Sequence, residues 1–155
     1  MVEAVVSGTL LAVVLAGVSK LNISALASSS NQSERVRVEA AINDNIQLLQ
    51  MEDSYLRLED MGSSSEQDAA CRNPTAHLKS HLEANVPPPA STRTSTAIER
   101  SLERLEESGI DILVAKYKFL SPEYKGQANA QDRWEYRTVE LNPNFSAKCY
   151  TTANQ

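Results

Sequence analysis

The feature that most constrains the fold is an apolar run at the start of the chain. Residues 2–18 read VEAVVSGTLLAVVLAGV; Glu3 is their only charge, and Lys20 follows the run. A bilayer span needs about 20 apolar residues, and aliphatic residues as far as Leu26 extend the run while Lys20 snorkels. A secretory signal would open with basic residues, whereas this run opens with an acid. We therefore predict a transmembrane helix over 1–26.

The next segment favours continuation of the same helix. No glycine or proline occurs between Gly17 and Gly62, and apolar residues recur with the helical period of 3.6. The predicted apolar face consists of Val38, Ala41, Ile42, Leu48, Leu49, Tyr55 and Leu56. The predicted polar face consists of Glu39, Asn43, Asp44, Gln47 and Gln50. We predict an amphipathic helix over 27–61.

The remaining residues, 62–155, are expected to form one small globular domain in a chain of 155 residues. Gly62 and the serines after it indicate a loop. We predict helices over 66–86, with Pro74 opening its second part, and 95–108, and strands over about 110–120, 133–141 and 145–151. Three consecutive strands suggest an antiparallel meander packed on the long helix, which is an α+β fold.

The two cysteines are far apart in sequence, at Cys71 and Cys149. Export across a membrane by the N-terminal segment would place them in an oxidising compartment, where an even count of cysteines favours a disulfide. The alternative is two unrelated buried thiols. We predict the disulfide.

Composition and motifs argue against catalysis. The formal net charge of −5 disfavours a broad electrostatic grip on nucleic acid, although a local basic patch remains possible. No nucleophile elbow, phosphate-binding loop or dinucleotide fingerprint occurs. We expect no enzyme activity, no cofactor and no metal.

Two sets of acidic and histidine residues are candidate metal ligands. The first is His77 and His81, four residues apart, with Glu83; solvated surface histidines are the simpler interpretation. The second is Asp111, Glu123 and Asp132 as calcium ligands, although no EF-hand spacing is present.

Aromatic and basic residues alternate in the strand region. The aromatic residues are Tyr117, Phe119, Tyr124, Trp134, Tyr136 and Tyr150, and the basic ones are Lys116, Lys118, Lys125, Arg133, Arg137 and Lys148. Such interleaving could bind single-stranded DNA or an anionic surface. A half-buried sheet with a charged outer face explains the pattern as well and is the favoured interpretation, so no specific nucleic acid is predicted.

The opening Val2-Glu3-Ala4-Val5-Val6 and the aliphatic run after it resemble the N-terminal segment of type IV pilins and pilin-like proteins, including pseudopilins. In that family a leader ending in glycine is cleaved, the new terminus is methylated, and the glutamate pairs with the terminal amine of a neighbouring subunit. The resemblance implies a long helix, half in the membrane and half amphipathic, packed against a small antiparallel sheet.

By the same resemblance the chain would be a structural subunit of a pilus or related filament, serving adhesion, motility, DNA uptake or secretion. Glu3 would form the ion pair, and Val2, Val5, Val6, Leu10, Leu11 and Val14 would pack between helices. The partners would be copies of the chain, other pilins, the inner membrane and the assembly machinery. The subunit would lie in the inner membrane first and then in a filament at the cell surface.

Two less specific interpretations stay open. A carboxylate at a helix N-terminus is favoured by the helix dipole whatever the protein does, so Glu3 needs no partner. The chain could equally be a single-pass membrane protein whose periplasmic domain is a binding or adaptor module.

Overall fold

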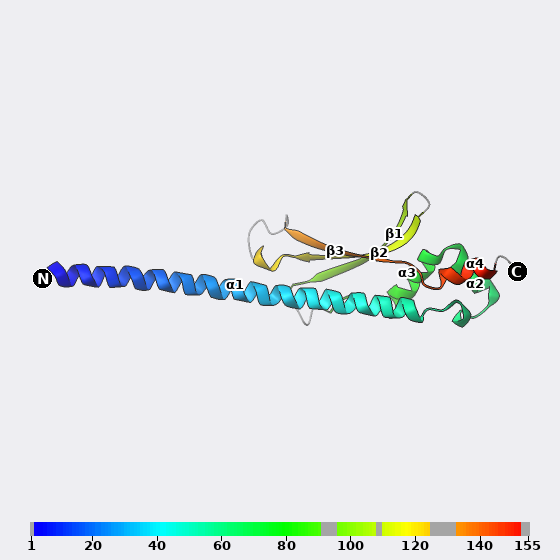
Figure 1. Cartoon of the computed structure of the whole chain (residues 1–155), viewed down its shortest axis with the longest axis horizontal. Coiled ribbons are helices and arrows are strands. Elements are labelled where there is room, and N and C mark those ends of the chain that lie inside the picture. The colour runs from blue at the N-terminus through cyan, green and yellow to red at the C-terminus, as the bar shows by residue number, and fades with distance from the viewer. Residues whose placement is uncertain (1, 91–95, 108–109, 125–132, 153–155) are drawn as a thin grey trace.

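The computed structural model consists of one long helix whose C-terminal half carries a small sheet, with short helices gathered at its C-terminal end (Figure 1). Helix α1 runs over Val2–Tyr55, 54 residues, which is about 81 Å at 1.5 Å per residue. Its N-terminal part extends beyond the rest of the molecule (Figure 1). The helix ends six residues before the predicted boundary of 61, and a 3-10 turn, η1 (Leu58–Asp60), follows.

The structure describes residues 2–90, 96–107, 110–124 and 133–152. Of residues 2–21, 23–24, 27, 106–107, 110 and 150–152, only the backbone is described.

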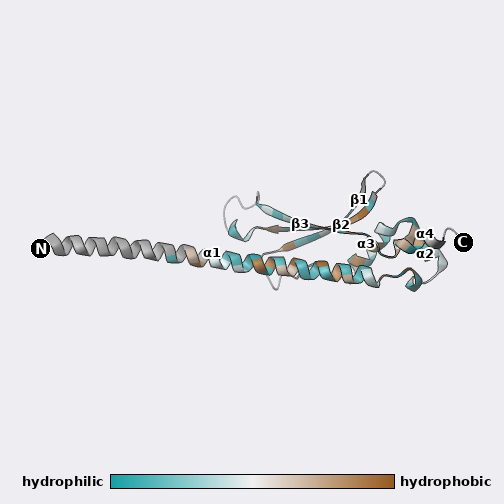
Figure 2. Ribbon diagram, viewed as in Figure 1, coloured by the Kyte–Doolittle hydropathy of each residue, from teal (hydrophilic) through white to brown (hydrophobic). Residues whose placement is uncertain are grey.

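The C-terminal half of α1 alternates apolar and polar residues along its length (Figure 2). Val38, Ile42 and Leu49 are completely or almost completely buried, because their spacing of four and seven residues brings them to one face. Leu48 and Tyr55, which the sequence placed on the apolar face, are exposed. Both lie to the side of the buried stripe, so the packed face is narrower than predicted.

The sheet is a three-stranded antiparallel meander in the order β1-β2-β3. Its strands are β1 (Ile98–Glu107), β2 (Ile110–Leu120) and β3 (Trp134–Leu141). The expected α+β arrangement of a long helix against a small antiparallel sheet is therefore present. The two strands predicted over 110–120 and 133–141 are confirmed as β2 and β3, but the third strand differs from the prediction.

The helix predicted over 95–108 is wrong, because the residues from Ile98 form strand β1. Ile98 and Leu102 are four residues apart, and such a pair shares one face both in a helix and in a strand. Leu105 distinguishes the two, since it joins that face only in a helix. It is 46% exposed, whereas Leu102 is buried, and pairing with β2 satisfies the backbone of this segment.

The strand predicted over 145–151 is also wrong, because these residues form helix α4 (Ser146–Thr152). Ser146 marks its start by donating from Oγ to the carbonyl of Pro143 at 2.7 Å. Phe145 and Cys149 have the same four-residue spacing, and here the helical alternative holds. Both pack into a cluster with α2.

The helical region predicted over 66–86 is present as two helices, α2 (Ser64–Arg72) and α3 (Pro74–Asn85). Ser63 and Glu66 form a capping box at the start of α2, which satisfies two free backbone N–H groups. Pro74 opens α3 as predicted, at a position where its missing N–H costs nothing.

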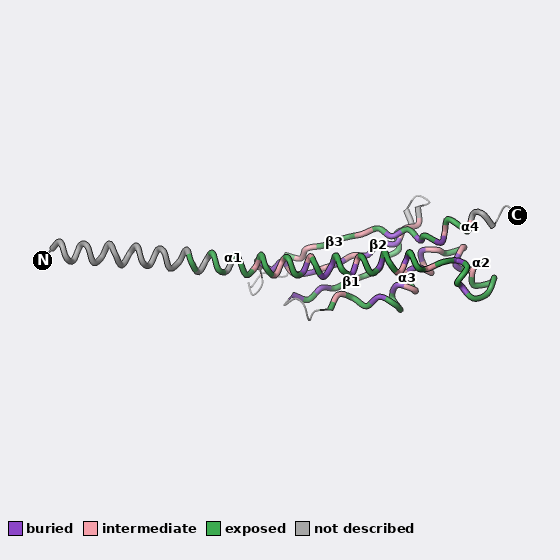
Figure 3. Tube along the Cα trace, turned by 60° about the horizontal axis from the view of Figure 1, so that its bottom comes forward, coloured by how far each residue is buried: buried purple, intermediate pink, exposed green. Residues whose placement is uncertain are grey.

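Two apolar clusters hold the domain together. The larger one joins α1, α3 and the inner face of the sheet, and the smaller one joins η1, α2 and Phe145 at the far end. Figure 3 shows the burial concentrated along the C-terminal half of α1. The inner face of β2 is almost closed off from solvent: Leu113, Ala115, Tyr117 and Phe119 are all completely buried.

Candidate functional site

The N-terminal part of α1 is the site that the sequence predicts for assembly. Its backbone is helical from Val2. The side chains of the predicted assembly residues lie outside the described ones: Glu3, Val2, Val5, Val6, Leu10, Leu11 and Val14. Among the described residues no helix combines the length and the apolar character that crossing a bilayer requires. Most of the predicted span, 1–26, has only its backbone described.

Where side chains of α1 first become described, the helix is uncovered. Leu26 is 71% exposed, Val36 is also exposed, and Val38 is the first buried residue among the described side chains of the helix. The backbone of the helix continues beyond the domain as a projection (Figure 1). Exposed aliphatic side chains on a projecting helix are an available surface for another chain or a lipid phase.

At the base of the domain, five alternating charges connect α1 to the sheet. Arg35 donates to Glu123 at 2.8 and 2.9 Å and to Glu135 at 2.6 and 3.1 Å. Arg137 on β3 donates to Glu39 at 2.5 Å and lies 3.7 Å from Glu135. We call this chain of residues, Glu123–Arg35–Glu135–Arg137–Glu39, the charge ladder.

The charge ladder changes the ionisation of its acids. Hydrogen bonds from Arg35, supported by Ser121, lower the pKa of Glu123 to about 2. The pKa of Glu135 is lowered as well, chiefly by its hydrogen bonds from Arg35. Paired, bidentate guanidinium–carboxylate contacts are the strong form of a surface ion pair. The ladder therefore holds β3 and the turn η3 (Pro122–Tyr124) against α1 wherever these carboxyls are ionised.

A buried polar network forms a second connection halfway along the packed part of α1. Asn45 is 4% exposed, and its Oδ1 accepts from Tyr117 Oη at 2.9 Å and from Arg100 Nη1 at 3.0 Å. Its Nδ2 donates to the carbonyl of Pro87 at 2.8 Å, while Arg100 Nη2 donates to the carbonyl of Val86 at 2.7 Å. One amide thus joins α1, β1, β2 and the proline segment after α3.

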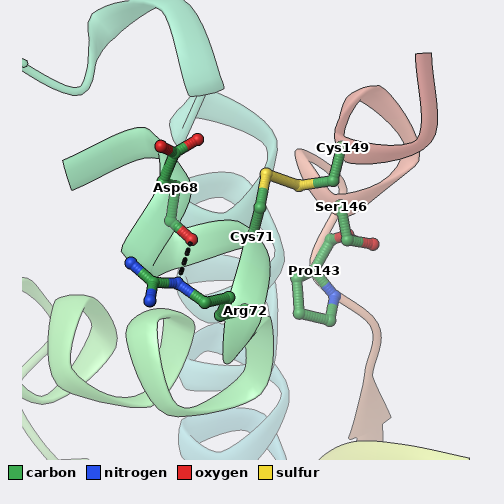
Figure 4. Close-up of a disulfide and its surroundings, with 6 residues drawn as sticks. All are labelled: Asp68, Cys71, Arg72, Pro143, Ser146 and Cys149. Carbon is green, nitrogen blue, oxygen red and sulfur yellow. Dashed lines mark hydrogen bonds between the residues drawn. A yellow bond between two sulfur atoms is a disulfide. The ribbon is translucent and has the colours of Figure 1, made fainter. Parts of the chain in front are cut away.

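The C-terminal segment makes the third connection. Asp53 near the end of α1 is buried, and it accepts from the backbone N–H and from Nδ2 of Asn144 at 3.2 and 3.0 Å. The predicted disulfide between Cys71 and Cys149 is present, with the two Cα atoms 5.5 Å apart (Figure 4). It joins α2 to α4, so the end of the chain is fixed at the end of the domain farthest from the projecting helix (Figure 1).

The candidate metal ligands from the sequence are not arranged around a common point. His81 is half-buried and pairs with Glu52 through Nε2 at 3.2 Å, and His77 packs edge-on against Phe145 at 5.8 Å. The expectation of solvated histidines therefore holds only in part, because both are half-buried against α1 and the C-terminal segment. Within the described ranges no three or more His, Cys, Asp or Glu residues are grouped to hold a metal ion.

The calcium candidates are likewise separated. Asp111 accepts from Arg104 at 2.8 and 3.0 Å and from Thr75 at 2.6 Å. Glu123 belongs to the charge ladder beyond the other end of β2. Asp132 lies outside the described residues. The two described acids are therefore used in separate contacts with guanidinium groups.

The aromatic residues of the strand region divide between the two faces of the sheet. Tyr117 and Phe119 are completely buried on the inner face, as the half-buried sheet interpretation expects. Trp134 and Tyr136 lie on the outer face, each beside a lysine ammonium. Tyr124 stacks with Arg133, and the side chain of Tyr150 lies outside the described residues.

Sequence reasoning missed both the charge ladder and the Asn45 network. One signal for the network was present, because Asn45 occupies the same helical face as Val38 and Leu49 and an amide there needs buried partners. No comparable signal existed for Arg35, whose partners are 88 and 100 residues away in sequence.

Comparison with known proteins gives no assignment. No protein-family model matches the chain, and neither a curated protein nor a solved structure matches it. The functional argument therefore depends on the residues and geometry described above.

Proposed function

We propose that the chain is a structural subunit of a type IV pilus or a related filament, assembled through the N-terminal half of α1. The observation that carries the proposal is the division of one continuous helix into two parts. The first part projects from the domain (Figure 1), with Leu26 exposed where its side chains are described, and the second is packed beneath the sheet. A helix of this kind suits a subunit whose projecting half becomes buried among neighbouring copies.

The connections between α1 and the domain support the same proposal. A subunit in a filament must transmit force between its buried helix and its outer domain. Here the charge ladder at Arg35, the network at Asn45 and the Asp53–Asn144 contact join the two parts at successive levels of α1. Side-chain contacts at separate levels, together with the apolar core, resist both sliding and peeling of the helix.

The opening of the sequence supplies the third support. Glu3 is the only charge in the run 2–18, and a carboxylate inside an apolar helix bundle is costly unless it is paired. In the proposed filament its partner is the terminal amine of a neighbouring copy. Insertion would precede assembly in the inner membrane.

The test is Glu3→Ala, expressed with a leader peptide that permits processing. Membrane-bound subunit and filaments sheared from the cell surface are quantified separately, with Asp68→Ala on exposed α2 as the control. We expect normal membrane levels and a loss of sheared filaments for Glu3→Ala alone, since breaking a buried ion pair costs about 3–5 kcal/mol. Normal filaments from Glu3→Ala would remove the ion-pair role. Membrane insertion of the wild type without any filament would favour the single-pass adaptor alternative.

A further inference from the structure

The outer face of the sheet carries aromatic and cationic side chains that the proposed assembly does not use. Lys116 and Lys118 on β2 alternate with the buried Tyr117 and Phe119, so they point away from α1. Trp134 and Tyr136 on β3 share that outer face. In the register, Lys118 lies opposite Tyr136, and Trp134 lies opposite Leu120.

These four side chains interdigitate. The Nζ of Lys118 lies 4.3 Å from the centroid of the Trp134 ring, and the Nζ of Lys116 lies 5.6 Å from that of Tyr136. The result is a row of rings and cations across β2 and β3, made of Lys116, Lys118, Trp134 and Tyr136, which we call the outer platform.

We propose that the outer platform binds single-stranded nucleic acid, with two successive bases on Trp134 and Tyr136 and the adjoining phosphates on Lys116 and Lys118. Two rings on alternate residues of one strand are about 6.6 Å apart. Rings spaced in this way on a sheet are a known platform for consecutive unpaired bases. Tyr136 is 49% exposed, so its ring is accessible before any ligand arrives.

The ammonium groups occupy the rings only weakly in the free protein. A cation–π contact at an exposed site is weaker than the stacking of a base on an aromatic side chain. A base therefore displaces the lysine from the ring, and the released ammonium is left beside the phosphate of the same nucleotide. When a base replaces the ammonium on the ring, the ammonium and the phosphate stay either solvated or paired with each other.

The acidic side chains around the outer platform determine the path that a bound nucleic-acid strand takes. Glu99 on β1 lies 3.7 Å from Lys118, and Glu103 lines the same shallow pocket of about 340 Å³ beside Lys116 and Tyr136. These carboxylates repel phosphates from the β1 side. The nucleic acid is thereby directed along β2 and β3. The same carboxylates limit the affinity of the protein for nucleic acid, as does the net charge of −5.

Trp134 is the only tryptophan of the chain, so its fluorescence reports directly on the outer platform. The full chain in non-ionic detergent is titrated with oligo-dT of about 12 nucleotides, within the range of known single-strand site sizes. Duplex DNA of the same length and base-free polyphosphate serve as comparison ligands. We expect saturable quenching by oligo-dT, because its bases can reach the ring. The duplex and polyphosphate should bind more weakly because neither offers free bases.

Three variants sharpen the test. Tyr136→Leu should weaken oligo-dT binding by at least about fivefold through the loss of one stacked base. Lys116→Gln should reduce the slope of log affinity against log salt by about 0.7, and Glu103→Gln should strengthen binding. The control is Lys79→Gln, on α3 and paired with Glu83, which should change nothing.

Absence of saturable quenching at low salt would overturn the proposal. So would equal binding of polyphosphate that Tyr136→Leu leaves unchanged, because that result describes a simple polyanion surface. The measurement uses isolated subunits, so its outcome is independent of whether the chain assembles into filaments.

Discussion

Tyr117 on β2 donates a hydrogen bond of 2.9 Å to Asn45 on α1, across 72 residues of sequence. Burial raises the pKa of the Tyr117 hydroxyl to about 12, so it remains a donor at every physiological pH. Arg100 donates to the same Asn45 oxygen, and burial lowers the pKa of that guanidinium while leaving it cationic. One amide oxygen of α1 therefore accepts from both β1 and β2.

The first prediction concerns this amide. Asn45→Leu leaves the Tyr117 hydroxyl without its partner and removes one hydrogen bond each from Arg100 and the Pro87 carbonyl, which keep their contact with each other. A buried polar group left unsatisfied costs about 1–3 kcal/mol, and a lost hydrogen bond to a charged group costs a similar amount. We expect a loss of about 3 kcal/mol or more in the free energy of unfolding. Tyr117→Phe leaves Arg100 on Asn45 and should cost only about 1 kcal/mol. Urea denaturation in detergent, followed by Trp134 fluorescence, measures both; equal effects would show that Asn45 is not the common acceptor.

The second prediction is a pH dependence at the charge ladder. Because the pKa of Glu123 is lowered to about 2 from an ordinary value near 4.3, its contribution is complete above about pH 5 and is lost as the pH falls towards 2. Arg35 and Glu123 are partly exposed, at 34% and 40% of their side chains. We therefore expect the Arg35–Glu123 contact to contribute only about 1 kcal/mol to the free energy of unfolding at pH 7.

Thermal unfolding of Glu123→Gln should show a lower Tm than wild type at pH 7 and a gap that closes between pH 5 and pH 2.5. Glu140→Gln removes an exposed carboxyl from the other face of β3 and serves as the matched control. A gap that stays constant across this range would mean that ionisation of Glu123 does not stabilise the contact with Arg35.

The third prediction concerns the disulfide. Cys71 and Cys149 are separated by 78 residues, and the chain-entropy relation gives about 4.5 kcal/mol for a loop of that length as an upper value. Changing both cysteines to serine should lower the free energy of unfolding by about 2–4 kcal/mol. The cluster around Phe145 should be affected most, because it holds α4 next to the bond. Hydrogen exchange that remains slow in α4 of the double variant would contradict this localisation.

How well the sequence predicts this fold depends on the spacing of the apolar residues in each segment. Long periodic segments are reliable, because the absence of glycine and proline over 18–61 leaves few alternatives to helix. Short segments are ambiguous where the only apolar pair is four residues apart. The sequence predicts a helix at Ile98 and Leu102, which lie in a strand, and a strand at Phe145 and Cys149, where Phe145 lies in a turn and Cys149 in a helix. In both segments the tertiary contacts determine the secondary structure: pairing with β2 in the first and packing against α2 in the second.

The candidate sites follow the same logic. The disulfide was predictable from the expectation of export, because cysteine has few roles in an oxidising compartment. The charge ladder was not, because arginine and glutamate on a helix surface are normally solvated, and no local pattern indicates a partner on another element. The outer platform was visible as interleaved residues, but only the register of β2 and β3 separates Trp134 and Tyr136 from the buried Tyr117 and Phe119.

The last prediction tests the segment where the structure and the sequence disagree most. In strand β1, Leu102 faces the core and Leu105 points to the outer face, 46% exposed. In a helix over the same residues, both would face inward. Leu102→Ala should therefore cost about 2–5 kcal/mol through the lost burial and the cavity left behind. Leu105→Ala should remain within about 0.5 kcal/mol, as surface substitutions usually do.

The two variants delete the same atoms three residues apart, so the side-chain chemistry is controlled within the pair. Alanine has the higher helix propensity, and a helical segment would therefore gain local stability from either change while losing packing from both. Urea midpoints with unchanged slopes would convert directly into the two free energies. A large and similar loss in both variants would place Leu105 in the core, which would contradict the β1–β2 register and restore a helix over this segment.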